Sequence, residues 1–130
     1  TGLDRDFLPS MADAIKIAAE YDIYLIFNLW TFEAFNDNQP AEWHGEHAGG
    51  HHDLALDAAK RKSLIDKAII PMLRYQVPGT AYTIGTHPNV VAWDIINEPE
   101  WRMGDGDWSL PNSDMQRFVA EQAGAIHRNS

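Results

Sequence analysis

One stretch of the chain carries its strongest structural signal: Val90-Val91-Ala92-Trp93-Asp94-Ile95-Ile96-Asn97-Glu98-Pro99. Half of its residues are apolar and either β-branched or aromatic, which favours a buried β-strand. Pro99 has no backbone N–H, so it cannot continue the hydrogen bonding of a central strand. The strand therefore ends by presenting Asn97 and Glu98, and a carboxylate delivered at the tip of an apolar strand is a candidate site for chemistry.

The composition is that of one globular domain with an acidic surface. The chain has 130 residues, of which 45% are hydrophobic, so it can build a core. Its formal net charge of -9 opposes binding to nucleic acid or to an anionic membrane surface, and its longest apolar runs are far too short to span a bilayer. The absence of cysteine excludes disulfides and thiolate sites. We expect no nucleic-acid partner, no membrane partner and no cofactor.

The pattern of the chain alternates between helices and strands. Apolar residues at helical spacing predict helices over Pro9–Tyr21 and Asp53–Tyr75, and a third helix begins near Ser113. Strands are predicted over Ile23–Trp30 and Val90–Glu98. This βα alternation requires crossover connections and predicts an α/β fold with a parallel sheet.

Three local expectations accompany this order. The nearly continuous apolar run of Ile23–Trp30 is typical of a strand that is buried on both faces, so Tyr24 and Phe27 are expected in the core. Pro71 should kink or break the long helix, because it cannot donate the bond back to Lys67. Ser113 and Gln116 have the spacing of a capping box at the start of the last helix.

The segments that follow the two strands are long and rich in tryptophan, whereas those that precede them are short. Because the carboxyl ends of parallel strands meet at one face, both long segments are expected there, where α/β proteins place their active sites. The tryptophans that this places on the same face are Trp30, Trp43, Trp101 and Trp108. Each of them could instead be a hydrophobic plug beneath its own loop.

Glu98 has both a structural and a functional interpretation. A lone glutamate at the end of a strand is usually a surface residue. Here the strand before it is apolar, Asn97 lies beside it and Pro99 fixes the exit of the chain. We therefore expect a partly desolvated carboxyl group, whose pKa is raised toward the range in which it can give and take a proton.

The segment from His44 to Asp53 contains four histidines and two acidic residues. Imidazole and carboxylate groups can hold zinc and other divalent ions. The spacing matches no established metal motif, however, and Asp105-Gly106-Asp107 lacks the ligands that a calcium loop needs. A solvated loop, a metal site and a substrate contact through His44 are the three alternatives, and we expect no metal.

The segment Trp93-Asp94-Ile95-Ile96-Asn97-Glu98-Pro99-Glu100 resembles the fourth-strand signature of glycoside hydrolase family 5 and its wider clan of (β/α)8 barrels. Similarity to the β-mannanase-like branch extends to Ile65–Met72, to His87-Pro88 and to Asn28-Leu29-Trp30. The resemblance implies that residues 1–130 are part of a catalytic (β/α)8 TIM barrel, with parallel strands and outer helices, from the second helix to the fourth. A complete barrel needs roughly 250 residues, so the remainder of the barrel is an implied partner.

The resemblance also implies a reaction: retaining, endo-acting hydrolysis of a β-1,4-linked polysaccharide, with mannan favoured over glucan, by a secreted enzyme. Glu98 would be the general acid/base, and Asn97 would hydrogen-bond the 2-hydroxyl of the sugar that is attacked. The catalytic nucleophile, a second Glu, would lie beyond Ser130, so the isolated segment is expected to be inactive.

The aromatic residues suit such a substrate, because pyranose rings have apolar C–H faces that pack on indoles. The expected substrate-binding residues are Asn97, Trp30, Trp43, His44, Trp101 and Trp108, whereas Trp93 is expected to pack inside the fold. Asp94 faces either the barrel interior or the helices. Two other functions remain open: a non-catalytic carbohydrate-binding barrel, and a small independent α/β interaction domain.

Overall fold

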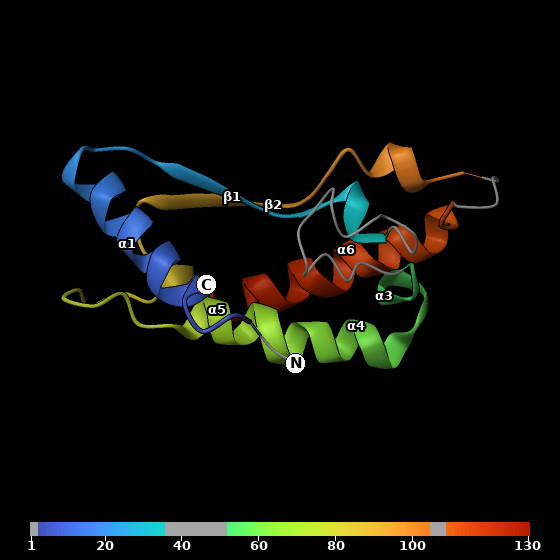
Figure 1. Ribbon diagram of the computed structural model, residues 1–130, viewed down its shortest axis with the longest axis horizontal. Helices are drawn as coiled ribbons and strands as arrows, with labels where there is room; N and C mark the ends of the chain where they lie inside the picture. Colours follow the sequence, from blue (N-terminus) through green and yellow to red (C-terminus); the bar gives the residue numbers. More distant parts are fainter. Residues whose placement is uncertain (1–2, 36–51, 105–108) are drawn as a thin grey trace.

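A two-stranded parallel sheet lies along one side of the molecule, and the helices lie along the other (Figure 1). The computed structural model describes residues 3–35, 52–104 and 109–130. In chain order the elements are α1 (Phe7–Glu20), β1 (Leu25–Thr31), the 3-10 helix η1 (Phe32–Phe35), α3 (Asp53–Leu56), α4 (Ala58–Leu64), the π-helix η2 (Ile65–Ile69), α5 (Ile70–Arg74), the 3-10 helix η3 (Ile84–Thr86), β2 (Val90–Asn97), the 3-10 helix η4 (Pro99–Arg102) and α6 (Asn112–His127).

The two strands run parallel, which confirms the predicted α/β class. Phe27 lies opposite Trp93 and Thr31 lies opposite Asn97. Parallel neighbours need a crossover connection, and here α3, α4, η2 and α5 supply it. The carboxyl ends of both strands therefore lie at the same end of the sheet.

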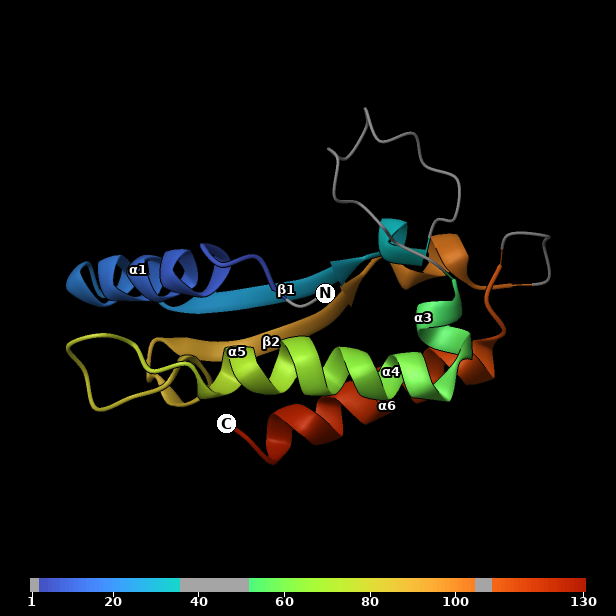
Figure 2. The same cartoon turned by 60° about the horizontal axis from the view of Figure 1, so that its bottom comes forward.

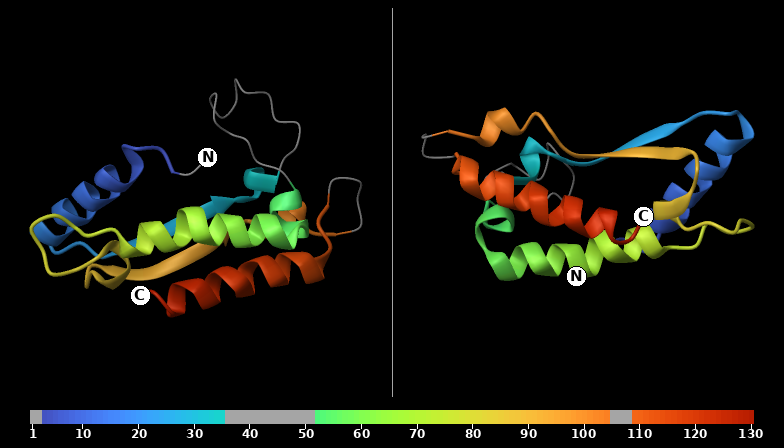
Figure 3. Two further views of the ribbon diagram at one scale, coloured as in Figure 1. Left: turned by 90° about the horizontal axis from the view of Figure 1, so that it is seen from below. Right: turned by 180° about the vertical axis from the view of Figure 1, so that it is seen from behind.

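The main core lies between the sheet and the helices. It contains Ile15 of α1, Leu73 of α5 and Ile126 of α6, all of them buried. Phe27 and Trp93 close it from the sheet side, with their rings stacked at a centroid distance of 5.5 Å. Figure 2 shows α4, α5 and α6 running alongside one another, and the right-hand view of Figure 3 shows these helices and α1 on one side of the strands. The prediction that Trp93 packs inside the fold is thereby confirmed.

A second core cluster supports the loop end of the sheet. Phe35 of η1 meets Phe118 of α6 edge to face, with ring centroids 5.0 Å apart, and Ile96 and Leu110 are buried with them. Arg61 ties the crossover helices to α6 nearby, because its Nε donates to Glu121 at 2.9 Å. The segment after β1 is thus anchored to the last helix.

The other face of the sheet is open. Tyr24, Ile26 and Val91 are 67%, 65% and 55% exposed. The prediction that the first strand is buried on both faces is wrong, as is the prediction that Tyr24 lies in the core. Within the described residues the helices cover one face alone and no third strand pairs with either edge, so nothing there shields these side chains.

The predicted long helix is interrupted, although not where proline was expected to interrupt it. The break is at Asp57, whose extended backbone ends α3 and whose side chain caps α4 by accepting from the N–H groups of Ala59 and Lys60. Before Pro71 the chain widens into the π-helix η2, and it then continues as α5 through Arg74. A π-turn changes the backbone bonding next to the missing proline donor, so Pro71 does not end the helix.

The expected capping box at Ser113 and Gln116 is also wrong. The helix α6 begins at Asn112, so the cap position is Pro111, whose carbonyl oxygen accepts from the backbone N–H groups of Asp114 and Met115.

The other helix boundaries agree with the predictions to within about two residues, as is usual for helix ends. None of the helices in the described part of the chain has the length and apolar character of a membrane span.

Gly85 provides a test of the packing between η3 and its neighbours. A Cβ atom at Gly85 would lie 2.9 Å from the carbonyl oxygens of both Leu73 and Asn129. Because backbone atoms cannot move aside cheaply, Gly85→Ala is expected to lower the free energy of unfolding by about 1–3 kcal/mol. The matched control is Gly124→Ala within α6, where the nearest contact is the flexible tip of Arg128 and alanine should stabilise by about 0.5–1 kcal/mol. Urea unfolding followed by circular dichroism measures both, and equal effects would contradict this account.

His87 gives the fold a pH dependence. Its side chain is buried beside the ring of Tyr82, and this burial lowers the pKa of His87 below its ordinary value of 6.5. As the pH falls, His87 therefore binds a proton in the unfolded chain before it does so in the folded chain. The contribution of neutral His87 to the free energy of unfolding is fully present above about pH 6.5 and declines as the pH falls below it, by at most about 1.4 kcal/mol per pH unit. Unfolding free energies measured between pH 5.5 and 7.5 (roughly the histidine range) should show this slope, and His87→Gln should reduce it. An unchanged slope in the variant would assign the effect to other groups.

Candidate active site

The segments that follow the two strands meet at one end of the sheet. Thr31 and Asn97 are paired at the ends of β1 and β2, and η1 and η4 start directly after them and contact one another. Figure 1 shows both short helices at the same end of the strands. The prediction that both segments gather at the carboxyl ends of parallel strands is confirmed for the residues that the structure describes.

Glu98 occupies the turn between β2 and η4. Its backbone is left-handed, with φ 53° and ψ 48°, a conformation that residues with a side chain adopt rarely. Pro99 then begins η4, and the N–H of Trp101 donates to the carbonyl oxygen of Glu98 at 3.2 Å. The turn therefore fixes the backbone of Glu98 at some cost in strain, as is common at functional positions.

The side chains of Asn97 and Glu98 are exposed. The expectation of a partly desolvated carboxyl group at Glu98 is therefore wrong for the described structure. The described residues around this turn leave the side chain of Glu98 in contact with solvent.

Asp94 lies on the open side of the sheet, which settles an alternative that the sequence leaves open. Its carboxylate accepts a hydrogen bond of 2.8 Å from the Nδ2 atom of Asn28, the residue opposite it in β1. Both residues are exposed, so this bond links the two strands without contacting the helical core.

Aromatic rings and a cation gather beyond Glu98. Trp101 is 67% exposed, and its ring centroid lies 6.2 Å from that of the half-buried Phe32, at an interplanar angle of 35°. The guanidinium carbon of Arg102 lies over the Phe32 ring, 5.9 Å from its centroid. The sequence predicts Trp101 at this end of the sheet, but it does not predict Phe32 or Arg102. The contact between these two residues depends on the strand register that brings η1 next to η4.

Trp30 has a different environment from Trp101. It is half-buried between the two core clusters, and its Nε1 donates a hydrogen bond of 2.7 Å to the Oε1 atom of Gln122 in α6. Trp30 therefore holds the end of β1 against the helical layer. Its role in binding substrate stays a prediction.

Three predicted binding residues, Trp43, His44 and Trp108, lie outside the described residues, as does most of the histidine-rich segment. In residues 3–35, 52–104 and 109–130, no group of three or more histidine or acidic side chains is arranged to hold a metal ion. The choice between a solvated loop, a metal site and a contact by His44 stays open.

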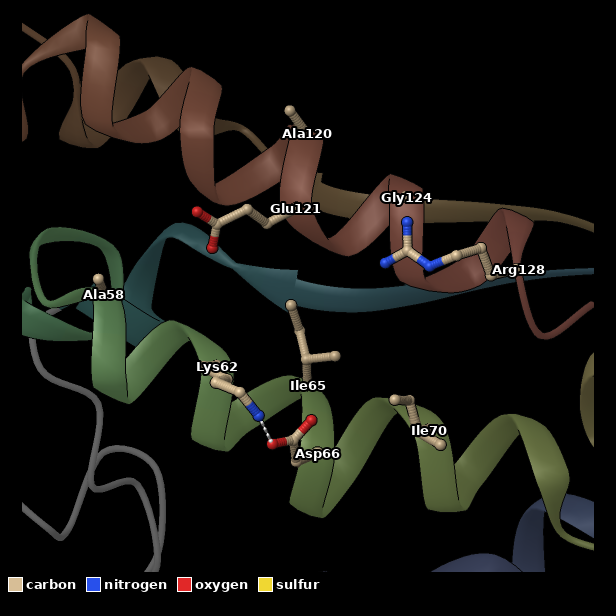
Figure 4. A pocket seen from close by; sticks show the side chains of 9 residues that line it. All are labelled: Ala58, Lys62, Ile65, Asp66, Ile70, Ala120, Glu121, Gly124 and Arg128. Atoms are coloured by element: carbon tan, nitrogen blue, oxygen red, sulfur yellow. Dashed lines mark hydrogen bonds and ion pairs between the residues drawn. The ribbon is translucent and has the colours of Figure 1, made fainter.

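A groove of about 490 Å³ lies elsewhere, between the crossover helices and α6 (Figure 4). Its lining side chains come from those helices alone, among them Ile65, Gly124 and the ion-paired Lys62 and Asp66. None of them belongs to β1, β2 or the segments that follow these strands. The groove is therefore separate from the candidate active site.

Comparison with known proteins gives one informative similarity. No family model matches the chain, and no solved structure matches it. A mannan endo-1,4-beta-mannosidase from Mytilus edulis is 28% identical over 125 residues, which are 95% of this chain and 29% of that protein. The chain thus spans less than a third of the length of this relative. The similarity is weak, and it points to a mannanase-like glycosidase.

The left-handed backbone of Glu98 leads to a stability prediction. Glycine adopts this conformation freely, so Glu98→Gly should raise the free energy of unfolding by a few tenths to about 1 kcal/mol, once the greater freedom of glycine in the unfolded chain is subtracted. Asp22, with φ 54°, is the matched control at the opposite end of the sheet. Aspartate tolerates this conformation better, so Asp22→Gly should gain less. A loss of stability in Glu98→Gly, measured by thermal unfolding, would show that the turn is not strained.

Proposed function

We propose that this chain is part of a glycoside hydrolase that cleaves β-1,4-linked polysaccharide with retention of configuration, mannan ahead of glucan, as in glycoside hydrolase family 5. The observation that carries the proposal is the position of Glu98. Its carboxylate follows a parallel strand directly, beside Asn97, at the end where the segments after both strands meet. The similarity to a mannan endo-1,4-beta-mannosidase over nearly the whole chain supports the same class of reaction.

In this mechanism Glu98 is the general acid/base. It protonates the glycosidic oxygen as the bond to the leaving sugar breaks, and it later takes a proton from the water that releases the product. Asn97 hydrogen-bonds the 2-hydroxyl of the sugar under attack. A retaining enzyme needs a second carboxylate about 5–5.5 Å away as nucleophile, which we assign to a part of the protein outside this chain. The isolated chain should for this reason be inactive.

The proposed setting is a (β/α)8 barrel of which this chain forms the portion from the second helix to the fourth. The one-sided covering of the sheet by α1, α5 and α6 is consistent with an outer ring of helices. The exposed apolar residues Ile26 and Val91, and the two strand edges that no other described strand pairs with, are consistent with further strands in the complete protein. These features argue against the small independent interaction domain.

The proposed partner is a neutral polysaccharide. The exposed indole of Trp101 offers an apolar surface to a pyranose ring. A formal charge of -9 disfavours polyanionic partners but does not disfavour a neutral polymer. We propose that the parent protein is secreted, because a polysaccharide is too large to enter a cell unaided.

Glu98→Gln in the full-length protein is the direct test. The variant keeps the size of the side chain and removes the carboxyl group that gives and takes a proton, so kcat/KM on galactomannan should fall about 100- to 10,000-fold. Glu100→Gln is the matched control, since it changes an exposed glutamate two residues away and should leave the rate within about twofold.

The outcomes separate the alternatives. Galactomannan hydrolysis faster than that of carboxymethyl-cellulose supports mannan as the substrate, and the reverse order supports glucan. Activity that survives in Glu98→Gln would remove Glu98 from the mechanism. Binding of polysaccharide without any hydrolysis would favour the non-catalytic carbohydrate-binding barrel.

A further inference from the structure

The cluster of Phe32, Trp101 and Arg102 stands directly beyond the candidate catalytic residues. Phe32 follows Thr31, which is paired with Asn97 across the two strands. The backbone N–H of Trp101 donates to the carbonyl oxygen of Glu98. Both aromatic residues are therefore fixed with respect to Asn97 and Glu98 by main-chain hydrogen bonds. The two rings therefore lie at the same end of the sheet as Glu98.

Trp101 exposes most of a large apolar side chain. Phe35, three residues after Phe32, is 2% exposed and packs on Phe118, whereas Trp101 remains 67% exposed. The 35° tilt between the Phe32 and Trp101 rings leaves their surfaces at an angle to one another. Such an arrangement matches the apolar C–H faces of a sugar ring, which has a substantial apolar surface and a polar rim.

Arg102 contacts the aromatic ring of Phe32 within this cluster. Its guanidinium group lies over the Phe32 ring, and among the described residues its Nε atom is buried without a hydrogen-bond partner. A desolvated cation gains more from an aromatic face than an exposed one does. The backbone of Arg102 is also fixed, because its carbonyl oxygen accepts from Leu110 at 2.7 Å. Arg102 thus ties η4 to the ring of η1.

We infer that Phe32 and Trp101 form a two-sided wall that binds a neutral pyranose ring of the polysaccharide next to the sugar attacked at Glu98, and that Arg102 is the positioning residue of this wall. The inference rests on the proposed function for the identity of the ligand. It adds Phe32 as a binding residue and gives Arg102 a role that acts through Phe32. The part of the ligand that the wall recognises is its apolar C–H face.

The test is a binding measurement in the full-length protein carrying Glu98→Gln, so that the ligand is not consumed. Calorimetric titration with β-1,4-linked mannohexaose gives Kd for each further variant. Phe32→Leu removes the ring and should raise Kd about three- to tenfold, whereas Phe32→Tyr keeps the ring and should stay within about twofold.

Arg102 is tested by rescue. Arg102→Met removes the cation and should raise Kd about two- to fivefold, while Arg102→Lys keeps a cation over the ring and should recover most of the affinity. Tyr82→Leu is the matched control. It changes a half-exposed aromatic that contacts His87 in the segment before β2, far from η4, and it should leave Kd unchanged.

The outcomes distinguish this inference from the proposed function. Hydrolysis by the protein with Glu98 intact, together with an unchanged Kd in Phe32→Leu, overturns the inference alone. Binding that is weakened in Phe32→Leu but not in Tyr82→Leu upholds the inference even if no hydrolysis is found. Absence of any binding to mannohexaose or cellohexaose overturns both. If Phe32→Leu does not fold, Trp101→Leu is measured in its place, and an unchanged Kd in that variant overturns the wall.

Discussion

The parallel pairing of β1 and β2 is the constraint on which the rest of the structure depends. Antiparallel strands would have placed the segments after β1 and β2 at opposite ends of the sheet. Parallel strands need a crossover, and the interrupted helix α3–α5 provides it on the face where the core forms. The pairing of Thr31 with Asn97 then determines what meets at the loop end. Phe32 is placed beside the turn that contains Glu98, although the two residues are far apart in the sequence.

The open face of the sheet follows from the same geometry. With α1, α5 and α6 on one side, Ile26 and Val91 remain exposed in the part of the chain that the structure describes, and the hydrogen bond between Asn28 and Asp94 lies on the same open side. Exposing apolar side chains costs about 25 cal/mol for each Å² left in water, and unpaired strand edges invite association with further strands. Both costs are removed if other strands of a longer protein cover this face.

The sequence predicts the order of the elements and the parallel sheet, because apolar periodicity and the stop at Pro99 are local signals. It does not predict the features that depend on a choice between local signals or on distant partners. Pro71 is a strong helix breaker in isolation, but the π-turn of η2 accommodates it, and the break occurs at Asp57, whose side chain can cap the following helix. The contacts of Phe32 and Arg102 depend on strand register, and those of Trp30 depend on the way α6 packs. The apolar run of β1 correctly indicates a strand, but it does not indicate that the described helices cover one face of that strand alone.

Glu98 shows how the candidate site divides between this chain and its surroundings. The backbone geometry is fully determined here, because β2 ends, the chain turns left-handed and Pro99 starts η4. The surroundings of its side chain are not, because the carboxylate is exposed in the described structure. A general acid must hold its proton near neutral pH, which requires desolvation or a neighbouring negative charge. We propose that the second carboxylate of the complete enzyme supplies that charge. The missing half of the site would thus contribute the nucleophile and also the environment that makes Glu98 an acid.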